Sequence, residues 1–142
     1  MTGVQTCALP IYYDDVVAEV VDHLRARCDA AVAAGVAPEA LMVDPGIGFG
    51  KTVDHNVALL AHLDALVERI EVPVLIGASR KSFLGVIAGT GDDPAEREAA
   101  TIATTVWAFE RGAAMVRVHD VAASVRAAAV LDRLQRSTTV AA

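Results

Sequence analysis

The chain has 142 residues, of which 54% are hydrophobic and 4% aromatic, and its formal net charge is −6. This length is enough for one ordinary domain with a buried core. An acidic chain without a stripe of Lys and Arg is a poor candidate for nucleic-acid binding, and no apolar run approaches the roughly 18 residues needed to span a bilayer. We therefore expect neither nucleic acid nor a membrane as a partner.

Residues 1–11 differ in pattern from the rest of the chain. They lack the basic start and the long apolar segment of a signal peptide, and they show neither a helix nor a strand period. They resemble the translation of a sequencing-adapter oligonucleotide, so we interpret them as a non-native scar. The two cysteines, Cys7 and Cys28, fit neither a disulfide framework nor a zinc site, which indicates a reducing cytoplasm.

The first half of the chain predicts a helix, a strand and a second helix. Apolar residues at helical spacing predict a helix over 14–34, which begins at acidic residues and ends before Gly35. The apolar run 41–43 predicts a buried strand. A Gly-rich loop then leads to a helix over 54–70, which we expect Asp54 to cap.

The second half continues this alternation. The run 74–76 predicts a second strand, and a short helix follows it through residue 87. Asp93 and Pro94 indicate the start of a longer helix that ends at Gly112. A third strand is predicted over 114–117, and a last helix begins at Asp120.

The order of elements indicates an α/β fold with about three parallel strands and four or five helices. The strands are short and apolar on both faces, as in a parallel sheet that is covered by helices. Three such units are only part of a TIM (β/α)8 barrel, which needs eight strands and about 250 residues. We expect this partial barrel to occupy residues 12–136 and a tail to follow over 137–142.

Three short motifs carry the chemistry, and each follows a predicted strand. They are Asp44-Pro-Gly-Ile-Gly-Phe-Gly-Lys51, Gly77-Ala-Ser-Arg-Lys-Ser82 and Arg117-Val-His-Asp120. Because the carboxyl ends of parallel strands meet at one edge of a sheet, we expect the three motifs to face one pocket.

The first motif allows three interpretations. Asp44 could accept two parallel hydrogen bonds from a ligand with adjacent N–H groups, or it could satisfy backbone N–H groups in a strand-to-helix turn. Gly50-Lys51-Thr52 also looks like the end of a phosphate-binding P-loop. That motif needs a glycine at position 45, however, and Pro45 occupies it.

The other two motifs supply cations. Arg80 and Lys81 are adjacent and cannot both face the same way, so we expect one of them to point into the pocket. Strand alternation places Arg117 and His119 on one face. A buried Arg117 needs an anionic partner, which could be a carboxylate or phosphate of a ligand, or an internal pair with Asp44 or Asp120.

Taken together, in this order and spacing, the motifs resemble the last three strand-end motifs of dihydropteroate synthase, over about residues 12–135. The resemblance implies the C-terminal part of a TIM barrel. It also implies a cytoplasmic transferase of folate biosynthesis that condenses 6-hydroxymethyl-7,8-dihydropterin diphosphate with 4-aminobenzoate and releases diphosphate. For the intact protein it implies a homodimer and Mg²⁺, whose ligand lies on an earlier strand, so we expect no metal ligand in this chain.

The resemblance also implies roles by position. Asp44 would hold the pterin ring, and Lys81 would contact the pterin carbonyl and a ring nitrogen. Arg117 and His119 would bind the leaving diphosphate, and with Lys81 they are the implied catalytic residues. The implied substrate-binding residues are Asp44, Phe49, Gly77, Ser79, Lys81, Arg117, Val118 and His119, with Ser79 and Phe49 bordering the aminobenzoate.

Other functions remain open at this stage. A folate-binding methyltransferase barrel would also hold a pterin with an Asp but would not need cations for diphosphate. A truncated, non-catalytic fragment with open sheet edges is a second alternative, and a P-loop nucleotide-binding module is a distant third. We expect this chain to be inactive on its own.

Overall fold

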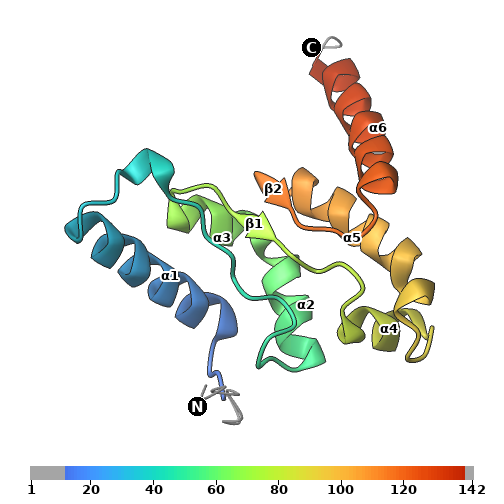
Figure 1. Cartoon of the computed structure of the whole chain (residues 1–142), viewed down its shortest axis with the longest axis horizontal. Helices are drawn as coiled ribbons and strands as arrows, with labels where there is room; N and C mark the ends of the chain where they lie inside the picture. Colours follow the sequence, from blue (N-terminus) through green and yellow to red (C-terminus); the bar gives the residue numbers. More distant parts are fainter. Residues whose placement is uncertain (1–11, 140–142) are drawn as a thin grey trace, which may run out of the picture.

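The computed structural model describes residues 12–139, and side chains are described for 12–137. Two short strands lie at the centre, and helices are arranged around them (Figure 1). The elements in chain order are α1 (Val16–Ala33), the 3₁₀ turn η1 (Pro38–Ala40), α2 (Val53–Ala61), α3 (Leu63–Ile70), β1 (Leu75–Ile76), α4 (Ser82–Ala88), the 3₁₀ turn η2 (Pro94–Arg97), α5 (Glu98–Glu110), β2 (Met115–Val116) and α6 (Val121–Thr139).

Three extended segments run parallel to one another. β1 pairs with β2, so that Leu75 lies opposite Met115. On the other side of β1, Val43 forms a parallel bridge with Val74, and the Leu75 N–H donates to the Val43 carbonyl at 2.8 Å. The expectation of about three parallel strands is confirmed, with β1 in the middle.

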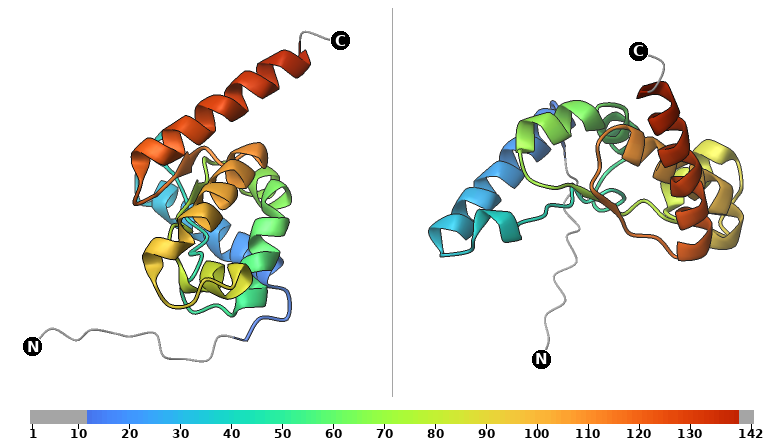
Figure 2. Two further views of the ribbon diagram at one scale, coloured as in Figure 1. Left: turned by 90° about the vertical axis from the view of Figure 1, so that its right-hand side faces the viewer. Right: turned by 90° about the horizontal axis from the view of Figure 1, so that it is seen from above.

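The helices lie mainly on one side of these strands, and the molecule forms an open arc rather than a closed ring (Figure 2). The buried core lies between the strands and the helices that cover them. The largest fully buried hydrophobic side chains of this core are Val21, Ile47, Leu59, Leu63, Leu66, Val74 and Ile76. The end of α6 extends away from this body (Figure 2). No helix within residues 12–139 is both long and apolar enough to cross a membrane.

Two helix boundaries differ from the sequence-based prediction. The expected helix over 54–70 is divided at His62, whose backbone (φ −106°, ψ 28°) leaves the helical region. Residues 12–139 therefore contain six α-helices instead of four or five. The cap of α2 is Thr52, not Asp54, because the extended Thr52 places its hydroxyl where it accepts from the His55 N–H.

The starts of α1 and α6 agree with the sequence, whereas the helix expected from Pro94 begins as the 3₁₀ turn η2 and becomes α-helical only at Glu98. The Asp15 carboxylate accepts hydrogen bonds at the start of α1, and the Asp120 carboxylate accepts from the Ala123 N–H at the start of α6. The last helix continues into the expected tail, through Thr139. The segment 1–11, which we interpret as a scar, lies outside the described residues.

Candidate active site

An ion pair between Asp44 and Arg117 joins the first and third motifs, although the two residues are 73 positions apart in the chain. The Arg117 guanidinium donates to the Asp44 carboxylate at 3.3 Å. The other Asp44 oxygen accepts from the Gly46 N–H at 2.8 Å. Two interpretations that the sequence left open are therefore both confirmed. Asp44 accepts from a backbone N–H in the turn after the strand, and it also forms an ion pair with Arg117 within the chain.

The expected burial of Arg117 is wrong. Its side chain is 62% exposed, whereas that of Asp44 is 31% exposed. The physical reason is that β2 is an edge strand of the described sheet, so the end of β2 opens toward solvent. An exposed pair of this kind adds little to stability, about 0–1 kcal/mol. Its two charges thus remain available to a ligand at small cost to the fold.

Gly77 explains how Arg117 reaches across the sheet. A Cβ atom at position 77 would lie 2.8 Å from an Arg117 guanidinium nitrogen, which is closer than real contacts allow. Only glycine lets the arginine cross the end of β1 at this distance. The second and third motifs are therefore in direct contact through Gly77 and Arg117.

Lys81 adds a second cation beside the ion pair. Its ammonium nitrogen lies 3.5 Å from the centre of the Phe49 ring, a cation–π contact between the first and second motifs. Desolvation by burial lowers the pKa of Lys81, the positive charge of Arg117 lowers it further, and Asp44 acts in the opposite direction. Lys81 therefore lies within electrostatic reach of both members of the pair.

The two adjacent cations diverge, as expected. Arg80 has a left-handed backbone (φ 56°), and its guanidinium points instead to Glu98, at 2.9 Å. The Arg80 N–H donates to the Thr101 hydroxyl at 3.0 Å. Lys81 is thus the cation of this motif that faces the site.

Ser79 and His119 form a further link between the second and third motifs. The Ser79 hydroxyl and the His119 Nδ1 are 2.8 Å apart, in a hydrogen bond whose direction depends on the imidazole tautomer. The same hydroxyl accepts from the His119 backbone N–H at 3.1 Å. Ser79 is buried, so these contacts hold the exposed His119 in place at the end of the third strand.

Val118 lines an apolar recess between β2 and α6, together with Phe109 and Val125. Its neighbour Arg117 lines the same recess, so this recess does not separate the two residues in the way that strand alternation predicts. The substrate-binding role that the resemblance implies for Val118 stays a prediction.

Sequence reasoning missed the buried arginine that supports the second motif. Arg97 is only 7% exposed, and its guanidinium donates to the carbonyl oxygens of Arg80 at 3.0 Å and Asp92 at 2.8 Å. An arginine beside the start of a helix looks like a solvent-facing charge in the sequence. Its sequence neighbours Asp93, Glu96 and Glu98 are acidic and favour a solvent-facing charge, so no signal in the sequence indicated its burial.

The P-loop interpretation of the first motif does not fit the position of Lys51. The Lys51 ammonium donates to the carbonyl oxygens of Gly46 at 3.0 Å and Phe49 at 3.3 Å. Desolvation by burial lowers the pKa of Lys51, and Asp44 partly offsets that effect. This ammonium is therefore engaged by its own loop rather than directed toward a phosphate.

The described residues offer no metal site of their own. No group of three or more His, Cys, Asp or Glu side chains in this part of the chain could hold a metal ion. The residues therefore do not fit the Mg²⁺ that the resemblance implies for the intact protein, and no step below depends on a metal.

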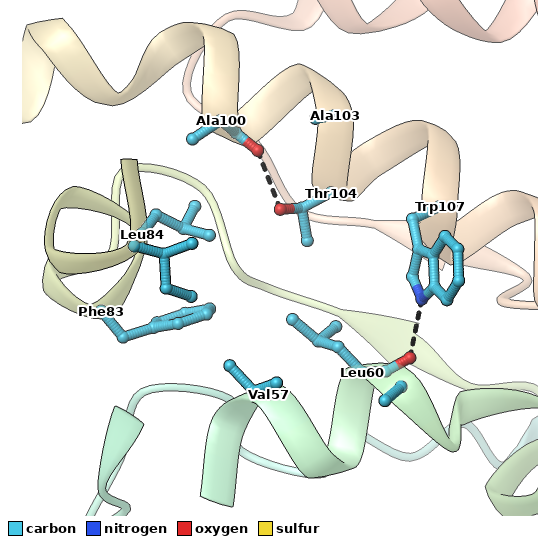
Figure 3. A pocket seen from close by; sticks show the side chains of 10 residues that line it. Val57, Leu60, Phe83, Leu84, Ala100, Ala103, Thr104 and Trp107 are labelled. Carbon is cyan, nitrogen blue, oxygen red and sulfur yellow. Dashed lines mark hydrogen bonds between the residues drawn. The ribbon is translucent and has the colours of Figure 1, made fainter. Parts of the chain in front are cut away.

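A separate apolar groove of about 410 Å³ lies between α2, α4 and α5 (Figure 3). Its polar groups are already paired: the Trp107 indole N–H donates to the Leu60 carbonyl at 2.7 Å, and the Thr104 hydroxyl donates to the Ala100 carbonyl at 2.8 Å. Neither Asp44, Lys81 nor Arg117 lines it. The groove lacks a free polar group to orient a small ligand, so it is a poor candidate for the active site.

The Trp107 bond gives a prediction for stability. Replacing Trp107 by Phe keeps an aromatic ring but removes the indole donor, which leaves the Leu60 carbonyl without its partner. We expect the free energy of unfolding to fall by about 1 kcal/mol, as measured by urea denaturation. A variant as stable as the wild type would show that solvent replaces this bond without loss.

The charges around Lys81 give a prediction for its titration. Because burial and Arg117 favour the neutral amine, half of the Lys81 amines should be deprotonated below the ordinary value of 10.5. The chain has only two lysines, Lys51 and Lys81, so ¹³C-methylated lysine gives one NMR signal for each. A Lys81 midpoint at or above 10.5 would contradict the desolvated position.

The fold and the site together define a partial (β/α) barrel whose candidate ligand site lies at the carboxyl ends of its strands. The sequence profile of the family described as "Pterin binding enzyme" matches residues 3–119. The chain belongs to this family, and the expected fold class, a part of a TIM barrel, is confirmed. The match begins within residues 1–11, whose foreign origin stays a prediction.

Several relatives carry the name dihydropteroate synthase. The Mycobacterium leprae protein is 52% identical over 123 residues, which cover 84% of this chain and 43% of the relative. The Neisseria meningitidis serogroup C protein is 46% identical over 115 residues, covering 81% of this chain and 40% of the relative. The chain thus spans less than half the length of these relatives.

Solved structures agree with these sequences. The Xanthomonas albilineans dihydropteroate synthase in complex with 7,8-dihydropteroate has a TM-score of 0.85 and 47% identity, covering 89% of this chain and 48% of that protein. The same enzyme with 4-aminobenzoic acid has a TM-score of 0.86 and 46% identity, covering 92% of this chain and 47% of that protein.

Proposed function

We propose that this chain supplies the strand-end part of the active site of a cytoplasmic dihydropteroate synthase. The substrates would be 6-hydroxymethyl-7,8-dihydropterin diphosphate and 4-aminobenzoate, and the products 7,8-dihydropteroate and diphosphate. The observation that carries the proposal is the convergence of Asp44, Lys81 and Arg117 from three separate motifs. The ligands named for the X. albilineans enzyme support this choice of substrates.

The charges suit the two ends of such a substrate. The Asp44 carboxylate would accept hydrogen bonds from the 2-amino group and N3–H of the pterin, and Lys81 would donate to the pterin carbonyl and a ring nitrogen. An open groove of about 460 Å³ lies next to Asp44 and is also lined by Phe49, whereas Lys81 and Arg117 lie outside its lining. In the free chain Asp44 is paired with Arg117, so a bound pterin would release Arg117 toward the diphosphate.

The reaction exchanges one bond for another at the pterin methylene carbon. The C–O bond to diphosphate breaks and its electron pair leaves with the diphosphate. The aminobenzoate nitrogen forms the new C–N bond and then loses a proton. Arg117, with His119 beside it, would stabilise the charge that develops on the leaving oxygen. These cations favour a synthase over a folate-binding methyltransferase barrel, which has no diphosphate to bind.

Since the chain spans 40–48% of the relatives compared, the activity would need the remaining barrel units. For the intact protein we keep the expectations of a homodimer, of Mg²⁺ held outside the described residues, and of small molecules rather than nucleic acid or membranes as partners. This chain alone should give no turnover.

A chimera tests the proposed function. Residues 12–135 of this chain would replace the matching part of the M. leprae relative, and formation of 7,8-dihydropteroate would be followed. We expect turnover by the folded chimera and none by the isolated chain. A chimera with native-like circular dichroism and cooperative melting but no product would contradict the proposal.

A further inference from the structure

The first motif forms a loop that is hydrogen-bonded to a buried side-chain amide, that of Asn56. Asn56, in the first turns of α2, is 1% exposed. Its side-chain oxygen accepts from the Gly48 N–H at 2.7 Å, and its side-chain nitrogen donates to the Thr52 carbonyl at 2.7 Å. Both bonds are short, and the amide that makes them is buried. Asn56 therefore joins the loop to the start of α2, although it does not reach the ligand site itself.

The loop residue that Asn56 holds, Gly48, lies against the side chain of Lys81. A Cβ atom on Gly48 would lie 2.7 Å from Lys81 Cδ and 3.3 Å from Cγ, so the Lys81 stem passes directly over the Gly48 backbone. The next residue, Phe49, contacts the Lys81 ammonium with its ring. Gly48 and Phe49 thus fix two parts of the same side chain, its stem and its head.

We propose that Asn56 is a positioning residue for Lys81, acting through the Gly48–Phe49 segment of the loop. The proposal deepens the proposed function, since it concerns how that site holds its lysine. Asn56 touches no reacting atom, and its effect depends on where it places the backbone of Gly48. A buried polar side chain with both of its hydrogen-bonding ends used is costly to replace and geometrically specific.

A purely structural role for Asn56 is the competing account. Asn56 could serve only to keep the start of α2 folded, through its bond to the Thr52 carbonyl. Thr52 provides a matched control, because its hydroxyl caps the same helix through the His55 N–H but has no bond to Gly48. Replacing Thr52 by Ala removes the cap, at a cost of about 1 kcal/mol, and keeps both Asn56 bonds possible.

The test is the NMR titration of ¹³C-methylated Lys81 in the full chain, in wild type, Asn56→Ala and Thr52→Ala. Release of the loop would return water to Lys81, whose other charged neighbours are Asp44 and Arg117. We expect the Lys81 midpoint to rise toward the ordinary value of 10.5 in Asn56→Ala and to stay unchanged in Thr52→Ala. This readout needs no pterin, so its failure is distinct from a failure of the proposed function.

Two results would overturn the proposal. One is a folded Asn56→Ala variant whose Lys81 midpoint equals that of the wild type. The other is an equal shift in Thr52→Ala, which would mean that fraying of α2 alone moves the lysine. If Asn56→Ala does not fold, Gly48→Ala decides: at its φ of +77° the alanine strains this part of the loop and its methyl group displaces the Lys81 stem, while Asn56 stays intact. An unchanged Lys81 midpoint in Gly48→Ala would then refute the positioning role.

Discussion

Replacing Arg117 by Ala in the M. leprae chimera should lower the rate of dihydropteroate formation about 10²–10³-fold. This loss corresponds to about 2.7–4 kcal/mol of transition-state stabilisation. Arg117 ends the third strand, where it is largely exposed and paired only with Asp44 among its described contacts. Its loss would remove a cation that we propose for the leaving diphosphate, and it would leave the buried core untouched. The measurement is the initial rate at saturating substrates, together with inhibition by added diphosphate.

Arg126→Ala is the matched control for this prediction. Arg126 is an exposed arginine of α6, so its removal changes the net charge equally but leaves the site alone. We expect the control to keep the wild-type rate. Equal losses in the two variants would indicate an effect of net charge, and an unaffected Arg117→Ala enzyme would remove Arg117 from the mechanism.

Replacing Asp44 by Asn should weaken pterin binding by about 1–3 kcal/mol. The amide can still accept from the Gly46 N–H, so the turn after the first strand should persist. The amide carries no charge, however, and it presents a donor where the pterin also presents N–H groups. Calorimetric titration of the chimera with a pterin measures the loss directly.

Asp54→Asn is the corresponding control, since Asp54 is an exposed acid in the first turn of α2. Its replacement removes the same charge at a distance from the ion pair. A pterin affinity that is the same for Asp44→Asn and wild type would exclude Asp44 as the residue that holds the heterocycle.

The strands and the convergence of the motifs could be predicted because both follow from short-range rules. Apolar runs that end at Asp44, Gly77 and Arg117 identify the strand ends. The parallel order of βα units then places these ends on one edge of the sheet. The pairing of Val43, β1 and β2 agrees with that derivation.

The features that were missed depend on contacts between distant segments. The burial of Arg97 follows from carbonyl oxygens of residues 80, 91 and 92 that meet only in the folded chain. Likewise, the exposure of Arg117 depends on which strand lies at the edge of the sheet. No pattern in the sequence reports these long-range contacts.

Helix boundaries were missed for a different reason. The break at His62 interrupts an apolar pattern that continues on both sides of it, so periodicity alone predicts one helix. At the start of α2, Thr52 and Asp54 are both good caps. The extended backbone of Thr52 decides between them, and the sequence does not contain that dihedral angle.

The central claim is that one site binds both ends of a pterin diphosphate, with an acid for the ring and cations for the anionic tail. It is tested most directly by calorimetry on the chimera, comparing 6-hydroxymethyl-7,8-dihydropterin with its diphosphate. We predict at least about tenfold tighter binding of the diphosphate, equivalent to about 1.4 kcal/mol, and loss of that gain in Arg117→Ala. A gain that persists in full without Arg117 would contradict the claim.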